Sequence, residues 1–170
     1  EQIANIGSQD MNDEVWLKLA HRINELVAMP DVDGIVITHG TDTIEETGYF
    51  LNLVIKSEKP VVLTAAMRPS TALSADGPLN FFNAVAVAAD KDAAGRGVLV
   101  VVNDWIHDAA SLTKTSTTAV QTFLSPLRGL VGVVAYGECE FYRGAVGRHT
   151  VNSEFSLDGV EVMPRVDIVM

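Results

Sequence analysis

The sequence predicts an α/β fold: a doubly wound, mostly parallel sheet with helices on both faces. Short apolar runs rich in β-branched residues alternate with helical periodicities along the chain. Strands that alternate with helices pair in parallel, and right-handed crossovers are the default. Long polar loops follow the apolar runs, as in folds that bind ligands at the carboxyl edge of the sheet. The 170 residues fit one domain with a sizeable core.

The first elements have clear local signals. Residues 12–28 are expected to form a helix, because apolar residues recur at helical spacing, at Val15, Trp16, Leu19, Ala20, Ile23, Leu26 and Val27. The apolar run within residues 31–38 predicts a strand. Thr43 and Glu46 fit a capping box that opens a second helix over residues 44–55.

The alternation continues with a strand over residues 59–65, of sequence KPVVLTA. Pro78 stands at a first helical position and opens a helix over residues 79–90. Residues 97–102, GVLVVV, form the most hydrophobic expected strand. Three strands and three helices therefore alternate, which is the basis for the fold class.

The pattern weakens toward the carboxyl end of the chain. We expect a short helix over residues 117–123, a strand over residues 130–135 and an edge strand over residues 140–142. A polar stretch then leads to a last expected strand over residues 166–170.

Composition narrows the possible functions. The net charge is −10 and the pI about 4.7, which argues against a nucleic-acid partner or an anionic membrane surface. The longest apolar runs, at residues 84–89 and 98–102, are too short to span a bilayer. Cys139 is the sole cysteine, so no disulfide forms within the chain.

The most informative segment is residues 35–47, IVITHGTDTIEET. It places the hydroxyl of Thr41 and the carboxylate of Asp42 where a strand ends and a helix begins, which is a ligand-binding rim in open α/β sheets. Position alone favours a plainer interpretation by roughly two to one, in which Asp42 caps the helix together with Thr43. Thr41 could likewise satisfy local backbone donors.

Further polar loops are expected near the same edge, at residues 5–10, 66–78 and 103–118. The last loop contains Lys114, whose spacing has no signal of its own; an isolated lysine is normally solvated. If Lys114 were buried near Asp42, it could help to move a proton.

Other residues in these regions have plain interpretations. Ser8 and Gln9 look like ordinary turn residues, and His39 is expected to pack or bond beneath the turn. The four histidines form no metal set with the acids, and no phosphate loop or nucleophile-elbow motif is present. No metal or cofactor is therefore expected, and the residue pattern alone leaves an α/β hydrolase or a binding domain of unknown ligand.

The chain resembles the bacterial L-asparaginase family, most closely its type II asparaginase and glutaminase-asparaginase branch. The segments that carry the resemblance occur in the family's order: NIGSQDM (5–11), DGIVITHGTDTIEET (33–47), KPVVLTAAMRPSTALSADGP (59–78), RGVLVVVND (96–104), TKTSTT (113–118) and RHTVNSEF (148–155). The combination of HGTDT with AMRP is highly specific.

The resemblance implies a domain arrangement. Family members begin with a strand and a threonine-glycine-glycine-threonine turn that carries the primary nucleophile, and they end with a smaller domain. Neither is found in residues 1–170, which are therefore expected to be part of one N-terminal catalytic domain that lacks its first strand. Such a piece is expected to be inactive by itself.

The resemblance also assigns catalytic roles. Thr41 matches the second catalytic threonine, Lys114 its proton-relay partner, and Asp42 the carboxylate that pairs with the substrate's α-ammonium group. The three together resemble a Ser-His-Asp arrangement with lysine in the base position. The backbone N–H of Thr41 would contribute to the oxyanion hole.

The remaining matched residues concern the ends of the substrate. Ser8 and Gln9 match the pair that binds the α-carboxylate and α-amino groups. The carbonyl of Ala66 would accept a hydrogen bond from the departing amide nitrogen. The implied reaction is hydrolysis of L-asparagine to L-aspartate and ammonia, with no cofactor.

Alternatives within this resemblance stay open. Gln9 and the TKTSTT run favour asparagine, whereas RHTVNSEF favours a dual-specificity glutaminase-asparaginase that also accepts L-glutamine. A non-catalytic amino-acid-binding relative is a further alternative, and the acidic charge disfavours a tRNA-linked amidotransferase subunit. The family resemblance also implies a homotetramer built as a dimer of dimers, located in the periplasm or secreted, with the cytoplasm as the alternative.

Overall fold

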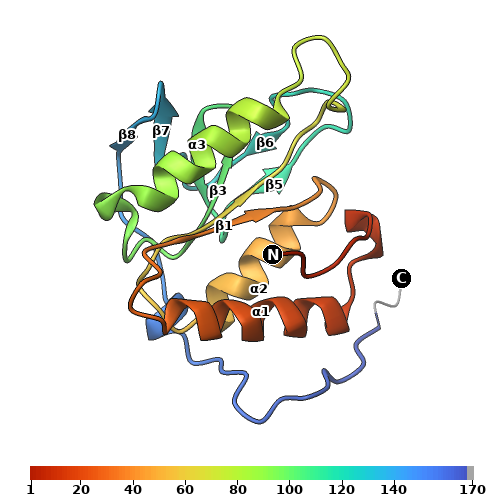
Figure 1. The fold of residues 1–170 in the computed structure, drawn as a ribbon, viewed down its shortest axis with the longest axis vertical. Helices are drawn as coiled ribbons and strands as arrows, with labels where there is room; N and C mark the ends of the chain where they lie inside the picture. Colours follow the sequence, from red (N-terminus) through yellow and green to blue (C-terminus); the bar gives the residue numbers. More distant parts are fainter. Residues whose placement is uncertain (168–170) are drawn as a thin grey trace.

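A computed structural model describes residues 1–167 and shows a six-stranded sheet with helices on both faces, which confirms the α/β class (Figure 1). The strands of this sheet, in spatial order, are β1 (Ile35–Thr38), β2 (Val61–Thr64), β3 (Val98–Val102), β4 (Trp105–Asp108), β7 (Gly132–Ala135) and β8 (Glu138–Phe141). A separate two-stranded ribbon consists of β5 (Thr113–Lys114) and β6 (Phe123–Leu124).

The helices of the described chain are α1 (Asp13–Val27), α2 (Ile44–Val54) and α3 (Gly77–Ala89), with short 3₁₀ turns η1 (Ser8–Asp10), η2 (Lys91–Ala93) and η3 (Thr150–Asn152). The three predicted helices and the three predicted strands before residue 103 are therefore confirmed, with ends that differ by a few residues. None of these helices has the length and apolarity needed to cross a lipid bilayer.

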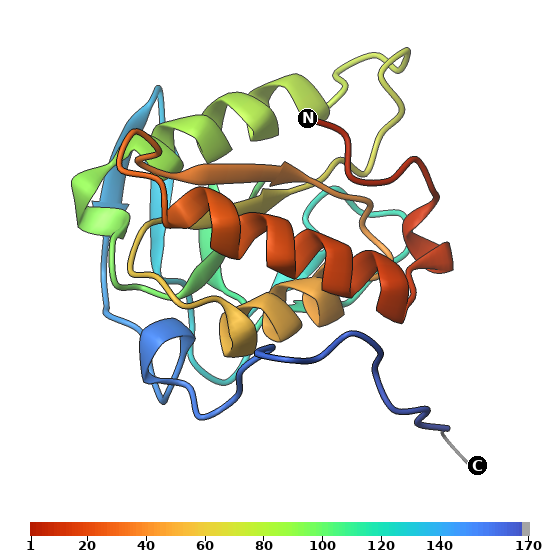
Figure 2. The ribbon, with the colours of Figure 1, turned by 60° about the horizontal axis from the view of Figure 1, so that its bottom comes forward.

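Two hydrophobic cores lie on opposite faces of the sheet. Alternate residues of β3 point to opposite sides: Val100 packs with α1 and α2, whereas Leu99 and Val101 pack with α3. Figure 2 shows the resulting layers, with α3 on one side of the sheet and the other two helices on the opposite side. All of β3 is buried, as its unbroken run of apolar residues requires.

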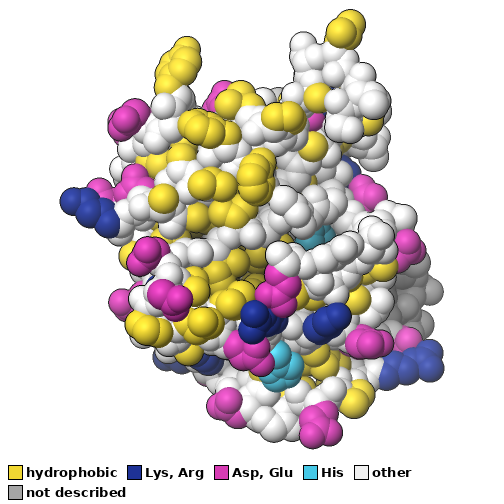
Figure 3. Space-filling model, in the orientation of Figure 1, with side chains coloured by type: hydrophobic (Ala, Val, Ile, Leu, Met, Phe, Trp, Pro, Cys, Tyr) yellow, Lys and Arg dark blue, Asp and Glu magenta, His cyan; other side chains and the backbone are white. Residues whose placement is uncertain are grey.

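The outward face of α3 is unusually apolar, because residues 77–89 contain no charged side chain. Leu79, Phe82 and Val85 are each exposed on this face. Figure 3 shows hydrophobic side chains gathered over the helix.

The two parallel crossovers have opposite hands. β1, β2 and β3 are parallel neighbours in that order, so both crossovers step in the same direction along the sheet. Their helices, α2 and α3, lie on opposite faces. One crossover must therefore be left-handed, and the expectation of right-handed crossovers throughout is wrong for it. The apolar residues Val62, Leu99 and Val101 on the second face provide the surface against which α3 packs.

The chain reverses after β3, where the sequence predicts a long loop. Asn103 and Asp104 adopt positive φ angles of 50° and 65° and form a tight turn. Asn and Asp tolerate this conformation, and such a turn joins antiparallel strands. β4 therefore runs antiparallel to β3, and β7 and β8 extend the sheet in the same antiparallel manner.

Two further predictions near the carboxyl end need correction. The short helix expected over residues 117–123 is wrong, because residues 117–122 belong to the turn between β5 and β6, and Phe123 begins β6. There Thr122 Oγ1 accepts from the Ser116 N–H at 2.8 Å, and the Thr122 carbonyl accepts from the Thr115 N–H at 2.8 Å, so these bonds close a turn between two strands. Residues 166 and 167 form no strand, and the rest of the last expected strand lies outside the described residues.

Candidate active site

The turn between β1 and α2 does not use its side chains to cap the helix. Thr43 occupies the N-cap position but makes no side-chain cap; its hydroxyl donates instead to the Ser8 carbonyl at 2.7 Å. The Asp42 carboxylate accepts from Lys114 Nζ. The capping-box prediction and the capping interpretation of Asp42 are therefore wrong, because residues distant in sequence supply better partners.

Lys114 joins the hydroxyl and the carboxylate of this turn. Its Nζ donates to Thr41 Oγ1 at 2.9 Å and pairs with Asp42 Oδ1 at 2.6 Å. The Lys114 side chain is 15% exposed and that of Asp42 is 54% exposed, so the cation is sheltered while the carboxylate faces solvent. The interpretation of Lys114 as an isolated, solvated lysine is wrong, and the three groups predicted to act together are in contact.

The backbone of Lys114 is also held in place. Its N–H donates to Glu45 Oε2 at 2.6 Å, in the first turn of α2. Glu45 therefore links the strand that carries Lys114 to the helix that follows Thr41. Sequence reasoning missed Glu45, because its partner is 69 residues away.

Ser8 lies against the same turn, in η1. Its buried hydroxyl oxygen accepts from the Asp42 N–H at 3.1 Å. Because the oxygen acts as an acceptor there, the hydroxyl proton remains available for a ligand. Gln9 is exposed, and its side-chain amide donates to Asp10 Oδ2 at 3.2 Å. The structure thus brings Ser8, but not the Gln9 side chain, into contact with Asp42.

Gly40 is required by the close approach of Ser8. A Cβ at position 40 would lie 2.4 Å from Ser8 Oγ and 2.7 Å from Ser8 Cβ. These distances are far below van der Waals contact, so any side chain at position 40 would displace Ser8 from the turn.

A series of hydrogen bonds from side chains of α1 and α2 holds the turn at His39 and Gly40. Trp16 Nε1 donates to Thr47 Oγ1 at 2.8 Å, and Thr47 Oγ1 lies 3.0 Å from His39 Nε2. The Gly40 carbonyl beside Nδ1 can only accept, so in a neutral His39 ring the proton is on Nδ1 and Nε2 accepts from the Thr47 hydroxyl. His39 Nδ1 then carries the proton and donates to the Gly40 carbonyl at 2.8 Å. Burial lowers the pKa of His39, consistent with a neutral ring.

Ala66 lies just after the end of β2, the strand that pairs with β1. Thr38 of β1 and Thr64 of β2 are register partners, so the segments that follow them emerge side by side. Ala66 is exposed, whereas Ala65 is buried and its carbonyl accepts from Asn80 Nδ2 at 2.8 Å. This arrangement presents the Ala66 backbone at the same edge of the sheet as Thr41.

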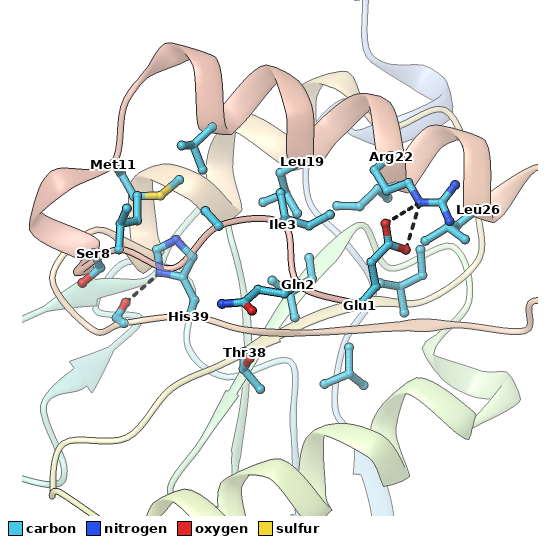
Figure 4. A pocket seen from close by; sticks show the side chains of 18 of the residues that line it. Glu1, Gln2, Ile3, Ser8, Met11, Leu19, Arg22, Leu26, Thr38 and His39 are labelled. Carbon is cyan, nitrogen blue, oxygen red and sulfur yellow. Dashed lines mark hydrogen bonds and ion pairs between the residues drawn. The ribbon is translucent and has the colours of Figure 1, made fainter.

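A cavity of about 950 Å³ lies beside the free edge of β1. Figure 4 shows the side chains that line it, which come from the N-terminal residues, from α1 and from β1. Ser8, His39 and Gly40 border the cavity, whereas Thr41, Asp42 and Lys114 do not. The cavity therefore adjoins the candidate site without containing its charged groups.

No group of three or more histidine, cysteine or acidic side chains that could hold a metal occurs among residues 1–167. The polar groups that converge on the HGTDT turn are instead one hydroxyl, one carboxylate and one ammonium, with a second hydroxyl from Ser8. Such a set can transfer a proton to or from a hydroxyl and bind a zwitterionic ligand.

Comparison with known proteins places the chain among related sequences and structures. The family model described as "Asparaginase, N-terminal" matches residues 1–147. The chain is 56% identical to a protein named "Probable L-asparaginase periplasmic" from Haemophilus influenzae, over 99% of this chain and 48% of the relative. It is 49% identical to a "Glutaminase-asparaginase" from Pseudomonas fluorescens, over 99% of this chain and 46% of the relative.

A solved structure, the "Probable Cytoplasmic L-asparaginase from Campylobacter jejuni", superimposes with a TM-score of 0.96 at 52% identity. The alignment covers 99% of this chain and 54% of the solved one. The chain thus spans about half the length of the relatives that it matches.

Proposed function

The chain belongs to the asparaginase family, and we propose that the protein hydrolyses L-asparagine to L-aspartate and ammonia. The observation that supports this most directly is the position of Lys114 Nζ, which contacts both Thr41 Oγ1 and Asp42 Oδ1. Amide hydrolysis needs an activated nucleophile and a proton carrier for a poor leaving group, and this cluster can serve the second need.

In the proposed reaction, Thr41 exchanges a proton with Lys114, and Asp42 keeps the ammonium group oriented. The Thr41 N–H would contribute to the oxyanion hole, where one donor is worth about 3 kcal/mol. Asp42, half exposed, would attract the substrate's α-ammonium group, and the free Ser8 proton would be donated to the α-carboxylate. Gln9 would assist at the same end of the substrate, after its side chain leaves Asp10.

We further propose that the primary nucleophile comes from a strand that pairs with the free edge of β1. Residues 1–170 would then be part of one catalytic domain that this strand completes. The cavity beside β1 supports this proposal, because its lining is largely apolar and includes Gly40. The 170-residue piece alone should release no ammonia from asparagine, and measurable release would overturn the proposal.

The test of the overall function is steady-state hydrolysis by the full-length protein, with ammonia and aspartate measured together. Equal amounts of the two products from L-asparagine are expected. Binding of asparagine without turnover would instead identify a non-catalytic amino-acid-binding protein and overturn the proposed activity.

Dual specificity is the second candidate, and it is favoured by the 49% identity to a relative named glutaminase-asparaginase. Asparagine and glutamine differ by one methylene, which a pocket discriminates by only about 1–3 kcal/mol. The ratio of kcat/KM for the two substrates separates the candidates. A ratio above roughly 100 in favour of asparagine would exclude the dual-specificity enzyme.

We also propose a homotetramer built as a dimer of dimers, located in the periplasm or secreted. The alternative location is the cytoplasm, since one relative is named periplasmic and another cytoplasmic. Light scattering on the purified protein and fractionation of the cells that produce it test these two points separately.

A further inference from the structure

We propose that Asp76 and Asn80 are positioning residues that aim the Ala66 carbonyl at the departing amide nitrogen. The inference rests on the proposed function, in which this carbonyl accepts a hydrogen bond from the amide group that leaves. It concerns two side chains at the N-terminal end of α3, a helix on the opposite face of the sheet from the helix that follows Thr41.

Asp76 stands at the N-cap of α3 but does not cap the helix. Its carboxylate points back to the loop after β2, where Oδ2 accepts from the Met67 N–H at 2.8 Å and Oδ1 accepts from the Arg68 N–H at 2.9 Å. An aspartate at this position would normally bond the first turn of its own helix. Both oxygens are used on the loop instead, which indicates that the carboxylate serves the backbone next to Ala66.

The bond to Met67 determines the direction of the Ala66 carbonyl. The Met67 N–H and the Ala66 C=O belong to one planar trans peptide group, so they point in opposite directions. When Asp76 holds the N–H, the carbonyl oxygen is turned away from α3. A charged acceptor on the N–H also polarises the peptide group, which makes the carbonyl oxygen a stronger acceptor.

Asn80 fixes the other side of Ala66. Its side chain is 3% exposed, and its Nδ2 donates to the Ala65 carbonyl at 2.8 Å and to Asp76 Oδ2 at 3.3 Å. Its Oδ1 accepts from the Asn103 N–H at 2.8 Å, at the end of β3. One buried amide therefore connects Ala65, Asp76 and the adjacent strand end.

The result is a rigid backbone around an unused acceptor. The peptide groups before and after Ala66 are both anchored, while Ala66 itself is exposed at the carboxyl edge. Among the hydrogen bonds of the described residues, none uses the Ala66 carbonyl. A carbonyl of an exposed residue, held this firmly and without a partner among the described residues, is suited to accept from a ligand's N–H group.

The experiment uses the full-length protein and two substrates that differ in the leaving group. L-Asparagine releases a nitrogen that carries N–H donors, whereas the β-methyl ester of L-aspartate releases an oxygen that carries none before it is protonated. Asp76→Asn should lower kcat for asparagine by roughly 10-fold, the effect of one lost hydrogen bond, with KM less affected. Its effect on the ester should be below about 3-fold.

Matched controls distinguish positioning from a loss of structure. Asp90→Asn makes the same substitution at the other end of α3, where Asp90 accepts from the Asp92 N–H at 2.8 Å, and it should leave both rates unchanged. Asn80→Ser, which removes the donor to Ala65, should repeat the amide-selective loss and serves as the second variant if Asp76→Asn does not fold.

An equal loss on both substrates, or no loss on either, would overturn the inference while the proposed function stands. Failure of the wild-type protein to hydrolyse asparagine would overturn the proposed function, and this is measured first.

Discussion

Lys114 Nζ lies 2.9 Å from Thr41 Oγ1, although the two residues are 73 positions apart. The contact exists because the chain turns back after β3, runs antiparallel through β4 and then returns to α2 as β5. The hydrogen bond from the Lys114 N–H to Glu45 holds β5 against the first turn of α2. A tight turn at residues 103 and 104 thus contributes to the position of the lysine in the candidate site.

Replacing Lys114 with methionine tests the proton relay. Lys114→Met keeps most of the length of the side chain but removes the charge and all donors. We expect kcat for asparagine to fall by about 10²–10⁴-fold with a much smaller change in KM, as for loss of a general acid or base. Steady-state kinetics on the full-length protein measure this, and unchanged kcat would contradict the role of Lys114.

Replacing Asp42 with alanine tests substrate binding. The half-exposed carboxylate is proposed to pair with the α-ammonium group, and a charged hydrogen bond is worth about 1.5–3 kcal/mol. Asp42→Ala should therefore raise the KM for asparagine by roughly 10- to 100-fold. Competition by L-aspartate should weaken in parallel, and a variant with wild-type KM would rule out this contact.

Replacing Gly40 with alanine tests the close approach of Ser8. The added Cβ would lie 2.4 Å from Ser8 Oγ, so Ser8 must move. We expect a destabilisation of about 1–3 kcal/mol and a raised KM. Gly144→Ala is the matched control, because a Cβ there meets nothing within 4 Å. Thermal unfolding and kinetics compare the two variants, and equal behaviour would refute the steric requirement.

The free energy of unfolding should decrease as the pH is lowered, because of His107. This histidine is fully buried in β4, and burial lowers its pKa to about 4, from 6.5. Between these values the unfolded state binds a proton that the folded state does not. The stabilisation is therefore complete above pH 6.5 and declines as the pH falls toward 4, by up to about 3 kcal/mol.

Urea unfolding at several pH values measures this dependence. His107→Asn should show a shallower decline than the wild type, even if its stability at neutral pH is lower. His21→Asn, at an exposed position, is the control and should keep the wild-type slope. Identical slopes for the wild type and His107→Asn would contradict the assignment.

The thiol of Cys139 should react slowly. Burial, followed by the nearby Asp90 carboxylate, raises its pKa to about 11 from 9.0. Because the thiolate is the reactive form, alkylation by iodoacetamide at pH 8 should be roughly 100-fold slower than in urea-denatured protein. Asp90→Asn should react faster than the wild type, and mass spectrometry follows the modified fraction.

Much of the local structure follows from the sequence. The helices α1, α2 and α3 and the strands β1, β2 and β3 each have an apolar periodicity or run that local hydrogen bonding can satisfy. The strand and the helix on either side of Thr41 and Asp42 are enough to predict a ligand-binding edge at this segment. These predictions depend on neighbours within a few residues, which the sequence displays directly.

Other features depended on contacts between distant segments. Lys114 has no local signal, and its pairing with Asp42 arises from the path of the chain through β4 and β5. Thr43 could have capped its helix, but the Ser8 carbonyl offers its hydroxyl a partner 35 residues away. The sequence by itself determined the alternation of elements and the residues at the edge of the sheet. Tertiary packing decided the hand of the crossovers and the partners of each polar group, because a hydrogen bond forms with whichever group the fold brings within reach.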